Sequence, residues 1–271
     1  MAGTADTPGS VGGVVTHPAY GVPRPVTEYA SVLLAGNPGP MTLDGTNTWL
    51  VGPPGGPATV VVDPGPDDEE HARRVAGLCS AELVLITHGH GDHTGGSRLL
   101  HELTGAPVRA TDPAHCIGGA PLRPGEVVGG GVALRVLATP GHTMDSVCLA
   151  LPPGGGVLTG DTVLGRGTAV IMHPDGSLGA YLESLRALAG LPAGTPALPG
   201  HGPDLPDLAG TARQYLAHRE ERLEQVRGAL RALGEGATAR EVVELVYADV
   251  DRALWWAAEL SVRAQLEYLR G

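Results

Sequence analysis

Short hydrophobic runs separated by glycine and proline dominate the chain from about residue 26 to residue 203. Runs of β-branched residues between such breakers are typical of strands. The pattern predicts strands over residues 26–34, 45–52, 58–63, 82–87, 132–138, 145–151 and 156–161.

Amphipathic stretches with helical spacing lie between some of these runs, over residues 67–79, 93–105 and 177–190. The strand runs greatly outnumber the strand–helix–strand units. Two facing sheets therefore fit better than one doubly wound sheet, and we predict a mixed α/β sandwich.

After Pro206 the pattern changes to nearly continuous helix, which predicts a second unit there. Its first helix has apolar residues at helical spacing, namely Leu216, Leu223, Val226, Leu230 and Leu233. Thr238 and Glu241 form a capping-box pair that opens a short second helix. The last helix has one apolar face, made of Trp255, Val262, Leu266 and Leu269.

Three successive helices suit either a helix-turn-helix module or a helical lid packed on the main domain, and periodicity alone leaves both open. Trp255 and Trp256 are adjacent and cannot face the same side of a helix. We therefore expect at least one of them to pack against the main domain.

The length of 271 residues allows one large core and a small accessory domain. We expect a flexible leader over residues 1–20, a catalytic domain over 21–205 and a helical domain over 206–271. Residues 1–20 lack the basic start and apolar core of a signal peptide, and no apolar run approaches twenty residues. A cytoplasmic protein without a membrane span is predicted.

The net charge of −11 disfavours a broad nucleic-acid footprint, because phosphate binding needs clustered cations. All 18 basic residues are arginine, so the chain has no P-loop lysine. The three cysteines, Cys79, Cys116 and Cys148, are odd in number and lack CxxC spacing. We expect small buried hydrophobic residues there rather than disulfides or metal ligands.

Candidate chemistry is concentrated in the sequence VLITHGHGDH, residues 84–93. In an extended turn, His88 and His90 point the same way, whereas Asp92 and His93 open a helix and face a neighbouring position. Two cations can therefore share this one loop.

Further candidate ligands lie at the ends of other predicted strands: His142 in ATPGHT, Asp161 in LTGD and His201 in LPGHG. A rigid sheet can fix such side chains with the accuracy that metal coordination demands. Imidazole and carboxylate ligands without thiolate suit Zn²⁺ and also tolerate Mn²⁺ or Fe²⁺.

The HGHGDH motif followed by single His, Asp and His turns resembles the metallo-β-lactamase superfamily. The resemblance implies an αββα sandwich with a two-zinc site and these ligands: His88, His90 and His142 on the first metal, Asp92, His93 and His201 on the second, and Asp161 as the bridge. It also implies that Asp63, which ends ATVVVD, supports the metal loop by hydrogen bonds without ligating.

The chemistry expected from this resemblance is hydrolysis by a metal-bridging hydroxide, with Asp92 and Asp161 as the candidate catalytic carboxylates. Two cations about 3.5 to 4 Å apart lower the pKa of a bridging water towards ~7 and stabilise developing negative charge. The chain has no GxSxG motif that would supply a serine nucleophile instead.

The segment NPGPMTLDGTNTWLVG, residues 37–52, resembles the endoribonuclease β-lactamase-like protein 2 branch, as do GDTVLGRGT (160–168) and QYLAHREER (214–222). The resemblance extends from about residue 28 to the end of the chain. In that branch the tail is a winged-helix-like domain, which favours the helix-turn-helix interpretation. Because the chain ends at residues 268–271, where a wing hairpin would begin, we expect a missing or very short wing.

Two substrate classes follow from this branch: single-stranded RNA as the leading one, and acyl-thioesters of the acyl carrier protein or CoA type as the alternative. Grooves for single-stranded RNA use stacking aromatics, yet this chain is acidic and has no Phe. True β-lactamases generally lack an aspartate bridge, so Asp161 disfavours antibiotic hydrolysis. A non-catalytic binding protein is disfavoured because all seven metal positions carry a residue that can bind a metal. The expected partners are single-stranded RNA, a small molecule or an acyl carrier protein. The sequence leaves the oligomeric state open.

Several residues outside the ligand turns are weaker candidates. His17, His71, His101, His115 and His173 are expected on the surface or at helix caps and not as ligands. His218 and Arg219 either reach the rim of the site or have an intrahelical or interdomain packing role. Arg166 either meets an anion or is a solvated loop arginine.

Overall fold

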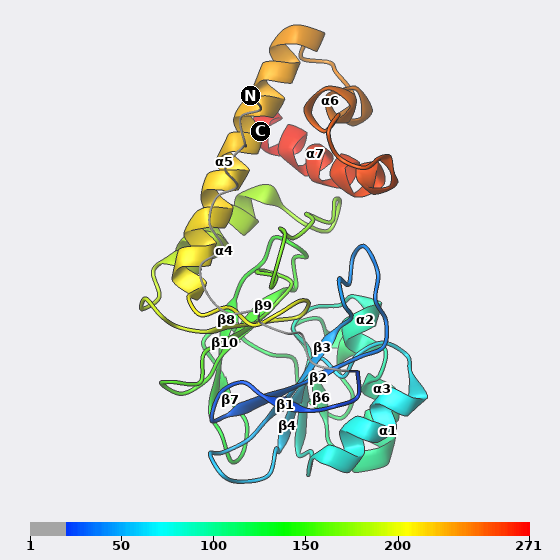
Figure 1. Ribbon diagram of the computed structural model, residues 1–271, viewed down its shortest axis with the longest axis vertical. Coiled ribbons are helices and arrows are strands. Elements are labelled where there is room, and N and C mark those ends of the chain that lie inside the picture. Colours follow the sequence, from blue (N-terminus) through cyan, green and yellow to red (C-terminus); the bar gives the residue numbers. More distant parts are fainter. Residues whose placement is uncertain (1–19) are drawn as a thin grey trace, which may run out of the picture.

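The computed structural model describes residues 20–271 and contains two mixed sheets that face each other, with helices on both outer sides (Figure 1). A helical unit stands at one end of this sandwich. The predicted α/β sandwich with a C-terminal helical domain is confirmed. Apart from Tyr20, the leader expected over residues 1–20 lies outside the described residues.

The first sheet has the strand order β1-β2-β3-β4-β5-β6, antiparallel up to β4 and parallel from β4 to β6. Its strands are β1 (Arg24–Pro25), β2 (Ala30–Leu34), β3 (Asn47–Val51), β4 (Val60–Val62), β5 (Leu83–Leu85) and β6 (Val108–Arg109).

The second sheet has the order β11-β10-β9-β8-β7, in which only β10 and β11 run parallel. Its strands are β7 (Val127–Val128), β8 (Leu134–Ala138), β9 (Val147–Ala150), β10 (Val157–Gly160) and β11 (Ala197–Pro199). The parallel pair brings the end of β10 beside the end of β11, with Gly160 opposite Pro199.

The helices fall into three sets. Helices α1 (Glu69–Leu78), α2 (Gly91–Thr94) and α3 (Ser97–Thr104) belong to the first half of the sandwich, and α4 (Leu178–Ala189) to the second. The end of the chain forms α5 (Leu208–Leu233), α6 (Ala239–Val246) and α7 (Trp255–Arg270), and short 3-10 turns lie at Pro113–His115 and Arg252–Leu254.

Alternate strand residues separate the core into layers. Trp49 and Leu85 of the first sheet meet Leu149 and Leu158 of the second in an apolar layer between the sheets. Removing these large side chains from water is the main stabilising contribution to the sandwich. The opposite sides of the sheets pack against α1 and α3, and against α4 and α5.

The seven predicted strands are all present, although most are shorter than expected. The strand end expected before His201 is β11. The strands β1, β6 and β7 were not predicted, because two residues are too few to show an alternating pattern. The helix expected over residues 93–105 is divided into α2 and α3. A Cβ on Gly95 would lie 2.3 Å from the main-chain nitrogen of Asp67, so the close approach of this segment requires glycine at the junction between α2 and α3.

The helical unit is built around α5, whose first part packs on α4 and whose second part packs on α6 and α7. The capping box of Thr238 and Glu241 is formed as predicted. The expectation for the tryptophans is wrong: Trp255 is buried within the helical unit, where α6 and α5 already offer an apolar surface, and Trp256 is half exposed. No helix among residues 20–271 has the length and hydropathy to cross a membrane.

The cysteines are free thiols in the structure. Cys148 is fully buried in the core, whereas Cys79 and Cys116 are only partly buried against the first sheet. Burial raises the pKa of the Cys148 thiol to about 11, so this side chain behaves as a small hydrophobic residue.

Candidate metal centre

Seven histidine and aspartate side chains that follow different strands meet at one edge of the sandwich. His88 and His90 follow β5, and Asp92 and His93 open α2. The other three come from the second sheet: His142 after β8, Asp161 after β10 and His201 after β11. They form two groups, in each of which the candidate ligand atoms lie within 4.8 Å of one another.

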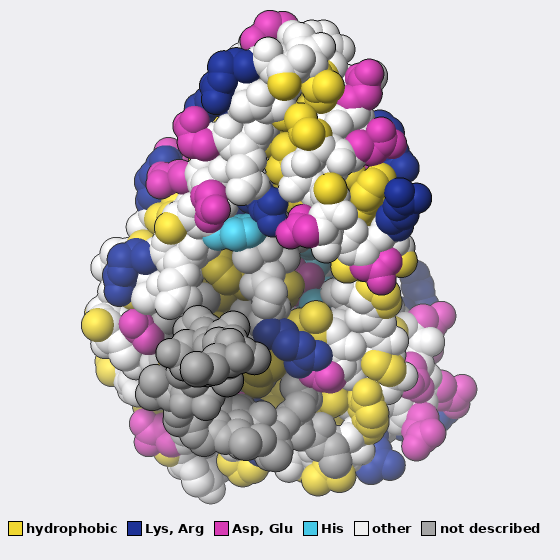
Figure 2. Space-filling view, turned by 45° about the horizontal axis from the view of Figure 1, so that its top comes forward, with side chains coloured by type: hydrophobic (Ala, Val, Ile, Leu, Met, Phe, Trp, Pro, Cys, Tyr) yellow, Lys and Arg dark blue, Asp and Glu magenta, His cyan; other side chains and the backbone are white. Residues whose placement is uncertain are grey.

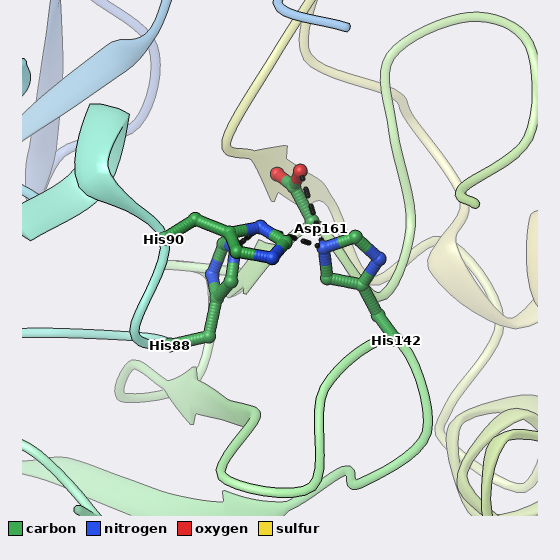
Figure 3. Close-up of side chains that lie close together, drawn as sticks. All are labelled: His88, His90, His142 and Asp161. Carbon is green, nitrogen blue, oxygen red and sulfur yellow. Dashed lines mark hydrogen bonds and ion pairs between the residues drawn. The ribbon is translucent and has the colours of Figure 1, made fainter. Parts of the chain in front are cut away.

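The first group consists of three histidines and one aspartate that converge on a common point (Figure 3). His90 Nδ1 lies 2.9 Å from His88 Nε2 and 3.2 Å from His142 Nε2, and His142 Nε2 lies 3.8 Å from Asp161 Oδ2. Two ligands bound tetrahedrally to one zinc ion at about 2.0 Å are separated by about 3.3 Å. The spacing of these atoms therefore fits a single cation.

The second group contains Asp92, His93 and His201. His201 Nε2 lies 3.2 Å from His93 Nε2 and 3.1 Å from Asp92 Oδ2. His93 and His201 are almost fully buried. Two buried ring nitrogens directed at each other and at a carboxylate suit a cation between them.

Asp161 faces both groups. Its Oδ2 atom lies 3.4 Å from His201 Nε2, and its Oδ1 atom lies 3.5 Å from His93 Nε2. Oδ1 is buried and has no hydrogen-bond partner. A buried carboxylate oxygen without a donor is unfavourable unless a cation neutralises it, so this atom also fits a metal.

Gly200 leaves the space that this arrangement needs. A Cβ at this position would lie 2.6 Å from Asp161 Oδ1 and 2.7 Å from His93 Cε1. Any side chain would therefore push apart residues of both groups.

In four of the histidines, the Nδ1 atom faces away from the site and lies near a hydrogen-bond acceptor. This contact fixes which ring nitrogen carries the proton. His88 Nδ1 lies 3.1 Å from Thr87 Oγ1, and His93 Nδ1 lies 2.8 Å from Asp63 Oδ2. His142 Nδ1 lies 2.5 Å from the carbonyl oxygen of Val170, and His201 Nδ1 lies 3.1 Å from that of Gly45. A proton on Nδ1 leaves the lone pair of Nε2 directed into the site, which is the form of histidine that binds metals.

The two groups differ in charge. Burial lowers the pKa of His88 well below its ordinary value and that of His142 to about 4, so both are neutral at pH 7. For His201, burial acts in the same direction, but the carboxylates of Asp161 and Asp92 outweigh it and raise the pKa. The second group therefore attracts positive charge, which a cation would supply in place of a proton.

The segment before and within β3 supports the second group. Thr46 Oγ1 donates a hydrogen bond of 3.0 Å to Asp92 Oδ2 and is itself held by Asn37. Asn47 Nδ2 donates to the carbonyl oxygens of Pro199 and Gly202, on either side of His201. The motif over residues 37–52 therefore orients two candidate ligands from the first sheet.

Asp63 supports the same group from β4. Its Oδ1 accepts a hydrogen bond of 2.8 Å from the Thr87 amide, and its Oδ2 faces His93 Nδ1. Asp63 belongs to neither group of candidate ligands. Its φ of 53° is left-handed, which costs about 1 kcal/mol for a residue with a Cβ. The strain turns the carboxylate towards the metal loop.

An open cavity of about 470 Å³ adjoins His90. Asp112, Asp145 and Asp175 line it together with His115, and neither Lys nor Arg does. Figure 2 shows a hollow between the helical unit and the sandwich, with acidic and histidine side chains at its floor. The approach to the first group is therefore acidic.

The weaker candidates of the sequence have other contacts. His71, His101 and His173 contact Thr48 Oγ1, Ala106 O and the Glu267 carboxylate, respectively, and His17 lies outside the described residues. Arg166 forms a two-pronged ion pair with Asp44, and half of its side chain stays exposed to solvent. Arg219 is buried and His218 is partly buried on α5.

Sequence reasoning missed the supporting residues Thr46, Thr87 and Val170 and the cavity carboxylates. Thr87 precedes the HGHGDH motif directly, and Asp145 follows His142 by three residues, so nearness to a ligand was an available signal. Val170 acts through its carbonyl group, which no residue type reveals.

Comparison with known proteins identifies both parts of the chain. A model of the metallo-beta-lactamase superfamily matches residues 41–201, and a model of the beta-lactamase associated winged helix domain matches residues 238–270. The lactamase-like protein aptB of Emericella nidulans is 35% identical over 252 residues, which are 87% of this chain and 79% of the relative.

Solved structures agree with the fold. A beta-lactamase domain protein from Burkholderia ambifaria has a TM-score of 0.76 at 24% identity, covering 95% of this chain and 92% of the other. The protein TTHA1623, solved in a di-iron-bound form, is 30% identical with a TM-score of 0.53, covering 65% of this chain and 95% of the other.

Proposed function

Since the chain belongs to the metallo-β-lactamase superfamily, whose members are generally metal-dependent hydrolases, we propose that it is a two-metal hydrolase of acyl-thioesters. The observation that carries the choice of substrate is the acidic cavity beside His90. Hydrolysis would add water across the acyl–sulfur bond and give a carboxylic acid and a thiol.

The residues fit two divalent cations, one in each group. His88, His90 and His142 would hold the first, with Asp161 between the groups, and the second group would hold the other. Bound divalent cations acidify water and polarise the carbonyl group of a substrate. The unpartnered Oδ1 of Asp161 and the inward lone pairs of the histidines support this assignment.

Charge balance supports a reactive centre. Although burial opposes it, the neighbouring histidines lower the pKa of Asp92 to about 2 and that of Asp161 well below its ordinary value. Both carboxylates are ionised at neutral pH. Two negative charges offset only half of the charge of two divalent cations, so the centre would keep an excess of positive charge that attracts a carbonyl oxygen.

Zinc is the metal we propose, because neutral imidazoles and carboxylates without thiolate form a ligand set that it favours. Iron is the other candidate, since the related protein TTHA1623 was solved with two irons. Elemental analysis of protein purified without added metal distinguishes them, and fewer than two metal equivalents after reconstitution would contradict a two-metal centre.

The charge around the site favours a neutral acyl group over a phosphodiester. Asp112, Asp145 and Asp175 would repel the phosphates of an RNA strand that entered beside His90. The described chain gives no compensating basic surface in the helical unit, since residues 208–271 contain nine arginines and ten acidic residues. Several of these arginines pair with a glutamate on the same helix.

Single-stranded RNA remains the second candidate substrate, because a winged-helix-associated domain matches residues 238–270 and winged helices commonly serve nucleic-acid binding. In that case binding would weaken steeply as salt increases. Absent or salt-insensitive RNA binding would exclude this substrate.

The test compares substrates on one enzyme preparation. Zinc-loaded protein is assayed on a neutral short-chain acyl thioester of N-acetylcysteamine, on an acylated carrier protein and on labelled single-stranded RNA, with Asp161→Ala as the inactive control. We expect thioester hydrolysis and no RNA cleavage. The variant Asp145→Asn should speed any cleavage of anionic RNA and leave a neutral short-chain thioester within about threefold. RNA cleavage with no thioester hydrolysis would overturn the proposal.

A further inference from the structure

We propose that Arg219 in α5 is a positioning residue for the first metal group and that the helical unit thereby serves the active site. The link runs through residues 167–171, here named the tether segment. This segment forms hydrogen bonds with His142 and with the C-terminal helices. This inference rests on the proposed two-metal function.

The site end of the link is the contact between His142 and Val170. His142 Nδ1 lies 2.5 Å from the carbonyl oxygen of Val170, the closest contact of any outer ring nitrogen in the two groups. The carbonyl holds the proton on Nδ1 and sets the angle of the ring, so displacement of Val170 would turn Nε2 away from the cation.

The other end of the link is in the helices. Arg219 donates a hydrogen bond from its guanidinium to the carbonyl oxygen of Ala169, and Tyr215 Oη, one turn earlier on α5, donates a bond of 2.6 Å to the carbonyl of Gly167. Ser261 Oγ of α7 accepts a bond of 3.3 Å from the Ile171 amide. The residues on both sides of Val170 are thus fixed by helices, while Val170 itself faces His142.

The burial of Arg219 is hard to explain by stability alone. Its side chain is 4% exposed, its Nε atom has no hydrogen-bond partner, and it pairs with no carboxylate among residues 20–271. A buried guanidinium with so few partners is unfavourable compared with an apolar side chain of the same volume. A positional task at Ala169 accounts for the presence of a charge there.

Arg219 also acts through Tyr181 of α4. The guanidinium carbon lies 5.3 Å from the centre of the Tyr181 ring, and Tyr181 Oη donates a bond of 2.7 Å to the carbonyl of Thr162, next to Asp161. The same tyrosine backbone covers Gly141, where a Cβ would lie 2.3 Å from its Cα. Arg219 is therefore linked to two ligands of the first group, to His142 through the tether segment and to Asp161 through Tyr181.

The experiment measures zinc affinity in Arg219→Met, which keeps the apolar stem and removes the guanidinium. Arg213→Met is the matched control, because Arg213 also lies on α5 and donates to a main-chain carbonyl, that of Ala189, at a place remote from the site. Competition with a chromophoric chelator should show about 10- to 100-fold weaker binding of one zinc equivalent in Arg219→Met. Arg213→Met should stay within about twofold of the parent, and Arg219→Lys should restore part of the affinity.

A double-mutant cycle with His142→Ala separates positioning from general loosening. If Arg219 acts mainly through His142, then Arg219→Met should weaken zinc binding much less in the His142→Ala background than in the parent, and only the part of the effect that passes through Tyr181 should remain. Equal affinity of Arg219→Met and the parent, or the same loss in both backgrounds, would overturn the inference. If Arg219→Met does not fold, Ser261→Ala replaces it in the same cycle, with a loss of about threefold expected.

Failure of the proposed function has a different signature. A parent protein that binds no divalent cation refutes the two-metal hydrolase itself. A parent that binds two equivalents, together with an Arg219→Met variant that does the same with equal affinity, refutes only the role of Arg219.

Discussion

The two metal groups lie side by side, yet they differ in electrostatics and in how they are held. The first, around His88 and His142, consists mainly of buried neutral imidazoles. In the second, the carboxylates of Asp92 and Asp161 raise the pKa of His201 against the effect of burial. The first group therefore suits a metal through lone pairs alone, whereas the second attracts any positive charge, including a proton.

Their supports come from opposite ends of the chain. Residues 37–49, in the first half of the chain, orient the second group. Asp63 reaches both groups, because its Oδ2 faces His93 Nδ1 and also accepts a hydrogen bond from Thr87 Oγ1, which contacts His88. The tether segment and the C-terminal helices orient His142 in the first. The difference teaches that two neighbouring groups of candidate ligands can be held largely by different segments, so the metal proposed for each group should be weakened by a different set of remote substitutions.

The largest effect is expected at the residue that the two groups share. Asp161 is the residue that faces both groups, so Asp161→Ala should reduce turnover by about a thousandfold or more and lower the zinc content below two equivalents. Glu183→Ala, an exposed ion-pair residue, is the control and should match the parent. Full activity of Asp161→Ala would refute the shared ligand.

Removing one histidine from each group tests whether the groups are separate. His142→Ala and His201→Ala should each retain about one zinc equivalent and lose on the order of a hundredfold in turnover. Zinc content is measured by elemental analysis after dialysis. If either variant lost both metals, the groups would behave as one cooperative site.

Thr46→Val tests the support of the second group in the way that Arg219→Met tests the support of the first. It removes the hydroxyl that donates to Asp92 and should weaken one zinc equivalent by about 10- to 100-fold. The loss should persist in the His142→Ala background and vanish in the Asp92→Ala background, the reverse of the pattern for Arg219. Thr211→Val, whose hydroxyl bonds a helix carbonyl, serves as the control.

The smallest effect concerns the pH dependence of stability without metal. The pKa of His142 is lowered to about 4, so the unfolded chain binds more protons between pH 4 and 6.5, and stability falls as the pH drops through this range. The pKa of His201 is raised, so the folded chain holds more protons above pH 6.5, and stability falls as the pH rises.

Metal-free protein should therefore be most stable near neutral pH and lose about 1 kcal/mol per pH unit on the alkaline side. Urea unfolding at pH 5, 7 and 9, with chelator or with zinc, measures this. Zinc should remove the alkaline decline, because the cation replaces the proton on His201. An alkaline decline that is equal with and without zinc would contradict the assignment of His201.

The sequence predicted those parts of the molecule that depend on local pattern. Apolar runs between glycine and proline located seven of the strands, and the histidines and aspartates that follow some of these runs located the seven residues that meet at the sandwich edge. The capping box at Thr238 was equally visible, because its two residues are three positions apart.

What the sequence did not reveal depends on contacts between distant segments. Val170 supports His142 through a carbonyl group 28 positions away, and glycine is required at position 95 because the main chain of Asp67 passes close by. The expectation that Trp255 or Trp256 packs against the main domain failed for the same reason, since periodicity indicates which face is apolar and not which partner covers it. The acidic cavity likewise gathers Asp112, Asp145 and Asp175 from three separate loops.

The hydrogen bonds from α5 and α7 to the tether segment have a consequence for protein engineering. A shortened version that ended after His201 and before α5 would retain every candidate metal ligand and still lack the groups that fix the backbone around Val170. Grafting a foreign C-terminal module onto this sandwich should therefore require transplanting the pattern of donors and acceptors at positions 215, 219 and 261 as well as the apolar surface. Whether the C-terminal helices can be exchanged therefore depends on three side chains as well as on where the domains are divided.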